Sequence, residues 1–301
     1  MTMTMNHLPH PRPWTSPLLT SALCATLGAA ALQAKVYNFN DATQWDEFYR
    51  TGNNIWSNPG TGGLSNTPWA AIGSGNNSIP GMLVRSESFS ATEETFTLGA
   101  YFFWSSAETG LATGSNDVLW LGIGQSGDPE KAFLPRNNGS DALAPESAQE
   151  LRLGLALVNG AGNDNKVRPR GGGAIDGVRM SSFTDNNNTV TLTQDSWYYL
   201  ELNFERAPIS TGYTLTLNLY EATGTGSKGE NILTYTTTQY NVALTTGELT
   251  PFVGSTSQRF SNVAGIDNLY LSIPEPSVTA LAIGGLVFLG VLRLRHSTAA
   301  K

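Results

Sequence analysis

The feature that most constrains this chain is a period-two alternation of apolar and polar residues along its central part. In segments 151–157, 196–206 and 213–220, every second residue is a large apolar one. Successive side chains of a strand point to opposite faces, so such a segment buries one face and exposes the other to solvent. Strands with one wet face usually pair antiparallel. The alternation therefore predicts an all-β, antiparallel fold.

Several further segments read as strands in the same way. We expect them at 36–39, 95–104, 117–125, 232–237, 250–254 and 265–273. Glycine- and asparagine-rich stretches, among them 171–173 and 185–188, are expected to be turns. One short helix is predicted over 41–49, with Asp41 as its N-cap. Since no Pro/Ser-rich linker divides the region, we expect one β-sandwich domain over residues 35–272.

The N-terminal segment has the pattern of a secretory signal peptide. A polar start containing Arg12 precedes an uncharged apolar run from Leu18 to Leu32. A basic start, a short apolar core and small residues at the cut are typical of such signals. Residues 1–34 are therefore predicted to be a signal peptide cleaved after Ala34, with Ala31 as the alternative position.

The C-terminal segment, residues 273–301, combines three further signals. Pro274, Glu275 and Pro276 precede an uncharged apolar run, 278–292. Arg293 and Arg295 follow this run. As a helix the run would reach about 22 Å, short of a hydrocarbon core of about 30 Å. We expect a short transmembrane helix whose basic residues hold the C-terminus in the cytoplasm.

This order of signals resembles the PEP-CTERM sorting domain of exported proteins from Gram-negative bacteria that make extracellular polysaccharide. The resemblance implies that Pro274, Glu275 and Pro276 are recognised by an exosortase-type enzyme, after export through the Sec machinery. It also implies transient anchorage in the inner membrane, followed by processing. The mature product would then lie at the cell surface or in the extracellular (biofilm) matrix.

The body has a looser resemblance, to concanavalin-A-like (laminin-G-like) jelly rolls. The opening strand VYNFND (36–41), the closing strand AGIDNLYL (264–271) and a Trp-Tyr-x-Leu strand entering a hairpin carry it. The resemblance implies a jelly-roll sandwich whose first and last strands are neighbours. A galactose-binding-like sandwich is the alternative.

Composition excludes several kinds of chemistry from the body. The histidines are His7, His10 and His296, and the cysteine is Cys24, all of them in the end segments. Histidine- or cysteine-dependent nucleophilic catalysis and His/Cys zinc sites are therefore excluded from residues 35–272. This region holds 13 basic and 23 acidic residues, so we expect no nucleic-acid partner.

The remaining catalytic candidates are two carboxylates. Glu201 and Glu205 share one face of a predicted strand, and paired carboxylates hydrolyse glycosides. The run ELNFE (201–205) resembles the Glu-x-Asp-x-Glu signature of jelly-roll glucanases, with Asn203 in place of the aspartate. A spacing of about 13 Å along a strand exceeds what a retaining pair needs. We expect a solvated face, with glycoside hydrolysis as the alternative.

Binding candidates lie in the loops. Trp56 and Trp69 have Asn/Gly-rich surroundings, so they are the tryptophans expected to stack on sugar rings. No cofactor is expected; Ca²⁺ at the loops containing Asp164 or Asp185 is the alternative, since such loops offer hard oxygens. A basic run, KVRPR (166–170), is expected to be a solvated loop, with contact to acidic polysaccharide as the alternative.

Together these observations predict an exported, non-catalytic surface or matrix protein whose jelly roll contacts polysaccharide. Two other functions remain open: a glycan-cleaving enzyme that uses Glu201 and Glu205, and a purely structural matrix component.

Overall fold

The structure, a computed structural model, describes thirteen stretches of the chain. They are residues 32–41, 48–51, 56–72, 81–84, 89–90, 95–106, 116–125, 151–159, 165–175, 178–206, 213–240, 248–254 and 263–274. All of them belong to one unit, Leu32–Pro274. The expected signal sequence up to Ala31 and the sorting tail from Glu275 onward lie outside the described residues.

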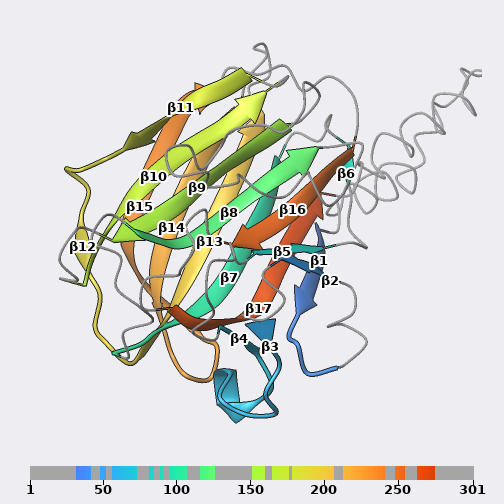
Figure 1. Ribbon diagram of the computed structural model, residues 1–301, viewed down its shortest axis with the longest axis vertical. Helices are drawn as coiled ribbons and strands as arrows, with labels where there is room; N and C mark the ends of the chain where they lie inside the picture. Colours follow the sequence, from blue (N-terminus) through green and yellow to red (C-terminus); the bar gives the residue numbers. More distant parts are fainter. Residues whose placement is uncertain are drawn as a thin grey trace, which may run out of the picture. The chain divides into compact units, whose positions relative to one another are not determined.

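The structure has two antiparallel sheets (Figure 1): the alternating segment at 151–157 lies in the second, and those at 196–206 and 213–220 are neighbouring strands of the first. Its order is β15 (Lys228–Tyr240), β14 (Tyr213–Ala222), β13 (Ser196–Arg206), β7 (Thr95–Trp104), β17 (Val263–Pro274), β4 (Ala70–Ile72) and β3 (Trp56–Ser57), and β1 (Leu32–Tyr37) also pairs with β17. Strand β13 runs in unbroken register between β7 and β14. This central part of the sheet positions the candidate site.

The second sheet lies across the core from the first. Its order is β11 (Val178–Thr184), β10 (Lys166–Ile175), β9 (Leu151–Asn159), β8 (Asn116–Gln125), β16 (Glu248–Gly254), β5 (Gly81–Val84) and β2 (Phe48–Thr51); β12 (Val190–Thr191) pairs with β10 and β6 (Phe89–Ser90) with β16. All the pairings in both sheets are antiparallel, so the predicted antiparallel β-sandwich is confirmed.

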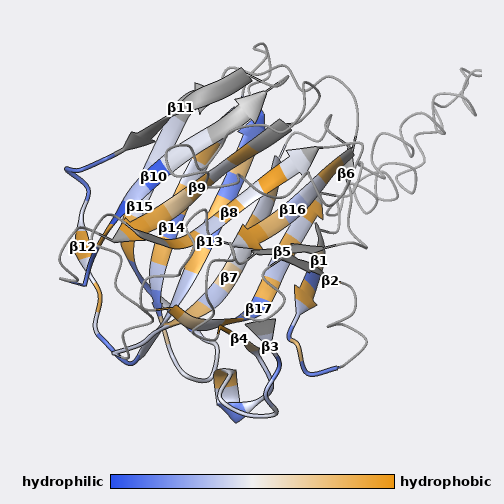
Figure 2. Cartoon of the chain, viewed as in Figure 1, coloured by the Kyte–Doolittle hydropathy of each residue, from blue (hydrophilic) through white to orange (hydrophobic). Residues whose placement is uncertain are grey.

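The core fills the space between the sheets with the apolar residues of each alternating segment. Leu200, Leu202 and Phe204 on β13 are at most 1% exposed, and Phe204 stacks on Phe96 with ring centroids 4.0 Å apart. Figure 2 shows apolar and polar positions following one another along these strands. Each such side chain contributes about 1.5–3 kcal/mol by leaving water, so the alternation fixes which face turns inward.

Two local expectations prove wrong. The helix predicted over 41–49 ends in a strand, since Phe48 and Tyr49 belong to β2 and pair with β5; residues 42–47 lie outside the described residues. The turn expected at 171–173 is part of β10, where the register shifts between Gly171 and Gly173. At Phe48 and Tyr49, pairing with the distant strand β5 decides the conformation. At 171–173, the glycines mark a β-bulge within a strand rather than a turn between strands.

The first and last described strands are neighbours, as the jelly-roll resemblance implied. Strand β1 pairs with β17 from Leu32 opposite Pro274 to Tyr37 opposite Leu269. The strand thus begins before residue 35, the expected start of the domain.

The described residues include no helix that is long and apolar enough to cross a membrane. The predicted membrane span, 278–292, lies outside them.

A buried carboxylate anchors a short 3-10 turn, η1 (Leu64–Asn66), to the first sheet. Asp267 is 1% exposed and accepts hydrogen bonds from the backbone N–H groups of Leu64 (2.8 Å) and Asn268 (2.7 Å). It lies where β17 bulges against β7, between Asp267 and Tyr270. Burial raises the pKa of Asp267 to about 6, although the two backbone hydrogen bonds oppose this shift.

This raised pKa predicts a pH-dependent stability. An unfolded aspartate titrates near pH ~3.9, below the folded value, so the stabilisation is complete below pH ~4 and is lost as pH rises through about 6. We expect Asp267 to lower the free energy of unfolding by about 2–3 kcal/mol between pH ~4 and ~7. Urea denaturation across this range should show that the Asp267→Asn variant lacks this pH-dependent loss of unfolding free energy. Asp185→Asn, in a surface turn, should retain it; parallel profiles for Asp267→Asn and the wild type would contradict the prediction.

Candidate functional site

A row of tyrosines crosses the outer face of the first sheet. In the strand register, Tyr199 on β13 lies opposite Tyr101 on β7 and opposite Tyr220 on β14. The ring centroids of Tyr101 and Tyr199 are 4.6 Å apart, and those of Tyr199 and Tyr220 are 6.2 Å apart. The row forms because each strand places its core residues on the opposite face. Three neighbouring strands therefore present aromatic rings to one surface.

Gly99 on β7 makes room for the central ring. A Cβ atom at Gly99 would overlap the hydroxyl and ring of Tyr199, which therefore lies across the strand and is 6% exposed. Burial, assisted by Glu201 and the neighbouring tyrosines, raises the pKa of Tyr199 well above its usual value. Burial also raises the pKa of Tyr101, against the charge of Lys228. Both phenols stay protonated near neutral pH.

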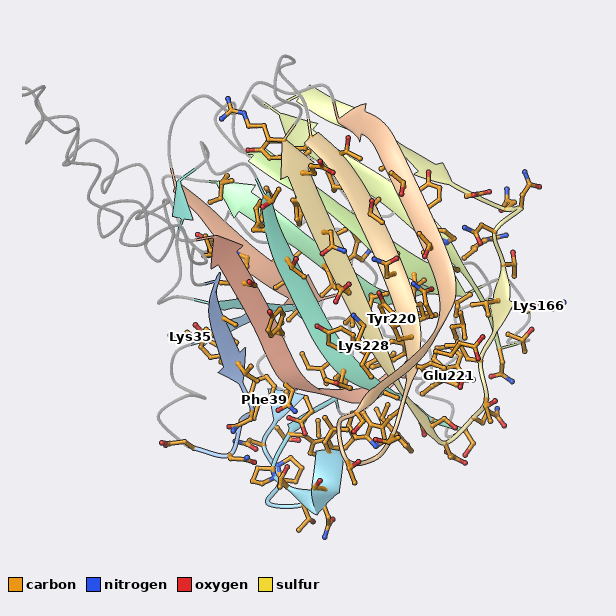
Figure 3. The ribbon with its side chains drawn as sticks, turned by 180° about the vertical axis from the view of Figure 1, so that it is seen from behind. Lys35, Phe39, Lys166, Tyr220, Glu221 and Lys228 are labelled. Atoms are coloured by element: carbon orange, nitrogen blue, oxygen red, sulfur yellow. The ribbon has the colours of Figure 1, made fainter. Side chains whose placement is uncertain are left out.

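An ion pair lies next to this row. The Lys228 ammonium donates a hydrogen bond to Glu201 Oε2 at 2.7 Å. The same ammonium lies 3.7 Å from the ring centroid of Tyr220 and 5.2 Å from that of Tyr199. Figure 3 shows Lys228 and Tyr220 side by side on the face turned toward the viewer. Burial alone would lower the pKa of Lys228, but Glu201 and Tyr220 outweigh it and raise that pKa.

Polar side chains extend the site along β13. The Tyr220 hydroxyl and the Asn203 amide each donate to Glu201 Oε1 at 3.4 Å, and the Thr97 hydroxyl donates to Asn203 Oδ1 at 2.7 Å. The Glu201 carboxylate is thus held by three neighbours. These bonds fix the side chains in advance of any ligand, which reduces the entropy lost on binding.

The hairpin between β14 and β15 closes one end of the site. The Tyr101 hydroxyl donates to the carbonyl of Gly226 at 2.6 Å, and the backbone N–H of Ser65 donates to the carbonyl of Gly224 at 2.6 Å. Gly226 has φ +81°, a conformation that favours glycine. The hairpin is thereby tied both to the sheet and to the turn held by Asp267.

These elements enclose a groove of about 530 Å³. Its walls combine the rings of Tyr101, Tyr199 and Tyr270 with the amides of Asn203 and Asn268, the hydroxyl of Thr97, and the Glu201–Lys228 pair. Aromatic faces with a few placed polar groups are typical of small-molecule and sugar sites. The arrangement can stack on a ring and exchange hydrogen bonds with hydroxyls.

The structure separates the two carboxylates that the sequence paired. Glu201 lines the groove, whereas Glu205, four residues further along β13, is exposed and does not. Ideal strand geometry places their Cα atoms about 13 Å apart, and a retaining glycosidase pair needs about 5–5.5 Å. Among the described residues, the side chain brought to Glu201 is Lys228 rather than Glu205.

Trp69 lies in an aromatic cluster on the same outer face. Its ring meets those of Trp197 and Phe103, with centroid distances of 5.7 and 6.4 Å. A Cβ atom at Gly265 would lie 2.5 Å from the Trp69 ring, which therefore rests on the backbone of β17. Trp69 is half-buried and supports the turn beside the groove. Trp56 belongs to β3 and pairs with Ile72; its side chain lies outside the described residues.

Of the calcium candidates and the basic run, the residues that the structure describes do not line the groove. Asp185 Oδ1 accepts from the backbone N–H of Asn187 at 2.9 Å, which stabilises its own turn. Asp164 lies outside the described residues, among which no group of three or more His, Cys, Asp or Glu could hold a metal ion. Lys166, Arg168 and Arg170 lie on β10, in the second sheet rather than in a loop.

Sequence reasoning did not single out the tyrosine row or Lys228. The sequence did hold a usable signal: in a strand, a tyrosine directly before or after a core residue points to the opposite, outer face. The sequence placed Tyr199 on the outer face of its strand, but it could not show which tyrosines of other strands would lie beside it.

No protein-family model and no curated protein matches the chain. Among solved structures, an alginate lyase from Aplysia kurodai is 10% identical with a TM-score of 0.53, covering 82% of this chain and 100% of its own. A protein of unknown function from Shewanella oneidensis MR-1 is 16% identical, with a TM-score of 0.43 and coverages of 88% and 96%. Lectin II from Ulex europaeus is 10% identical, with a TM-score of 0.42 and coverages of 75% and 92%. At these identities, the alginate lyase shows a shared fold only.

The close approach at Gly99 predicts that this position tolerates no side chain. We expect Gly99→Ala to displace the Tyr199 ring and to destabilise the protein by about 1–3 kcal/mol through overpacking. Thermal denaturation would measure the change in Tm. Gly60→Ala is the matched control, since a Cβ atom there meets nothing within 4 Å. Equal Tm values for the two variants would show that Tyr199 does not rest on Gly99.

Proposed function

We propose that this protein is a glycan-binding β-sandwich whose groove on the outer face of the first sheet holds a polysaccharide segment. The observation that carries the proposal is the convergence of three tyrosine rings, two amides and a hydroxyl on one groove. Sugar recognition needs aromatic faces for the apolar side of a pyranose and amides or hydroxyls for its polar edge. The hydrogen bonds among Thr97, Asn203 and Glu201 hold several of these groups in place.

The fold is compatible with this proposal, but the groove rather than the fold is the reason for it. The chain shares its fold with an alginate lyase, a protein named for its action on a polysaccharide. The proposal is for binding rather than cleavage, because Glu201 is engaged by Lys228 and the second carboxylate, Glu205, does not line the groove.

Tyr270 tests the groove directly, because it is half-exposed and lines the wall on β17. We expect Tyr270→Ala to weaken glycan binding roughly tenfold, as loss of one buried aromatic contact does. Tyr270→Phe, which keeps the ring, should retain most of the affinity. Calorimetric titration with soluble oligosaccharides from the producing cell's own matrix would measure both.

The matched control for this experiment is Thr216→Ala, on the outer face of β14 beyond the groove. Its affinity should equal that of the wild type. Equal affinities for the wild type and Tyr270→Ala would place the binding surface elsewhere, and absence of binding to a broad glycan panel would overturn the proposal.

We further propose that the chain is exported by the Sec machinery and sorted through its C-terminal tail. The support is the signal-like N-terminus together with Pro274, Glu275 and Pro276 ahead of an apolar run and a basic end. An exosortase-type enzyme would be the processing partner, with transient inner-membrane anchorage before delivery to the cell surface or matrix. Contact with matrix polysaccharide through the groove would then occur outside the cell.

Sorting can be tested without disturbing the sandwich. Pro274 pairs with Leu32 at the end of β17, so it is best kept, and Glu275→Ala with Pro276→Ala changes the rest of the triplet. We expect this double variant to accumulate in the inner-membrane fraction at the expense of the surface and medium fractions. Immunoblots of cell fractions would measure the shift. Asn186→Ala with Asn187→Ala, in an exposed turn, is the control, and identical fractionation of both variants would contradict the proposal.

A further inference from the structure

The charges of the groove cancel. Among the described residues that line it, Glu201 and Lys228 are the ionised side chains, and their charged atoms are 2.7 Å apart. The remaining lining groups are phenols, amides, a hydroxyl, an aliphatic side chain and backbone. No net positive charge is therefore offered to a ligand at this site.

The pair is also held in place. Glu201 accepts from Tyr220 and Asn203, while the Lys228 ammonium lies over the rings of Tyr220 and Tyr199. A ligand carboxylate that bound Lys228 would either lie beside the Glu201 carboxylate, which repels it, or displace Glu201 and leave it unpaired at a half-buried position. Leaving one member of such a pair without its partner is costly.

The net negative charge of the rest of the domain also disfavours anionic ligands. With 13 basic and 23 acidic residues, residues 35–272 repel polyanions at long range. The basic residues Lys166, Arg168 and Arg170 lie on β10 of the other sheet, so they do not line this groove.

We propose that the Glu201–Lys228 pair makes the groove selective for neutral glycans over uronate-containing ones. This inference rests on the proposed glycan-binding function and names the ligand class of that site. The pair presents hydrogen-bond partners to sugar hydroxyls, while the Glu201 carboxylate rejects a ligand carboxylate in its vicinity. Glu201 is thereby a specificity-determining residue.

The test compares chain-length-matched neutral and uronate oligosaccharides: glucan, galactan and xylan fragments against alginate and polygalacturonate fragments. Calorimetric titration of the whole domain should show the wild type binding a neutral fragment at least ~10-fold more tightly than any uronate fragment. Its neutral-glycan affinity should change little between ~50 and ~500 mM salt, because the ligand itself carries no charge.

Glu201→Gln then isolates the pair. The variant frees Lys228 while keeping a hydrogen-bonding side chain of nearly the same shape, so uronate affinity should rise roughly tenfold and become salt-sensitive. Glu205→Gln removes the same charge from the same strand outside the groove and should leave the ratio unchanged. Lys228→Met, which leaves Glu201 unpaired, should widen the preference for neutral glycans.

The outcomes separate the two proposals. A wild type that prefers uronate fragments, or a folded Glu201→Gln variant with an unchanged ratio, overturns neutral selectivity while glycan binding stands. If Glu201→Gln does not fold, strong salt dependence of wild-type binding or an unchanged ratio in Lys228→Met overturns it instead. A wild type that binds neither class overturns the glycan-binding function and the selectivity together.

Discussion

The ladder that β13 forms with β7 and β14 is the interaction on which the rest of this structure depends. Its unbroken register turns Leu200, Leu202 and Phe204 into the core and leaves Tyr199, Glu201 and Asn203 on the outer face. A slip of one residue would exchange the two sets, so packing of the core fixes the composition of the groove. Stability and the candidate function are thus set by the same pairing.

The groove is built from contacts that cross the sheet rather than follow one strand. Gly99 on β7 accommodates the ring of Tyr199 from β13, and Lys228 reaches Glu201 from the start of β15. Asp267 on β17 holds η1, and η1 in turn meets the hairpin that carries Gly226. Because each contact joins segments far apart in sequence, the site requires the completed sheet, and a change in one strand is transmitted to its neighbours.

Sequence patterns were most successful where one local rule decided the outcome. Period-two alternation predicted the strand at 95–104, and at 196–206 it predicted both the strand and its inward face, because the rule concerns neighbouring residues only. Other local signals failed: the helix expected from an N-cap at Asp41 ends in a strand at Phe48 and Tyr49 that pairs with β5, and the glycines at 171–173 mark a bulge rather than a turn. For the site, the sequence identified Glu201 but paired it with Glu205, since it could not supply a partner from another strand.

The sequence by itself determined an antiparallel β-sandwich, the outward position of Tyr199, Glu201 and Asn203, and a body without histidine or cysteine. These follow from composition and from the alternation of side chains along a strand. Only the tertiary structure decided that Tyr101, Tyr270 and Lys228 join them around one groove, that Trp69 packs against Trp197, and that Asp267 is buried with a raised pKa. The physical reason is that strand order and burial depend on pairings between distant segments, which no local pattern encodes.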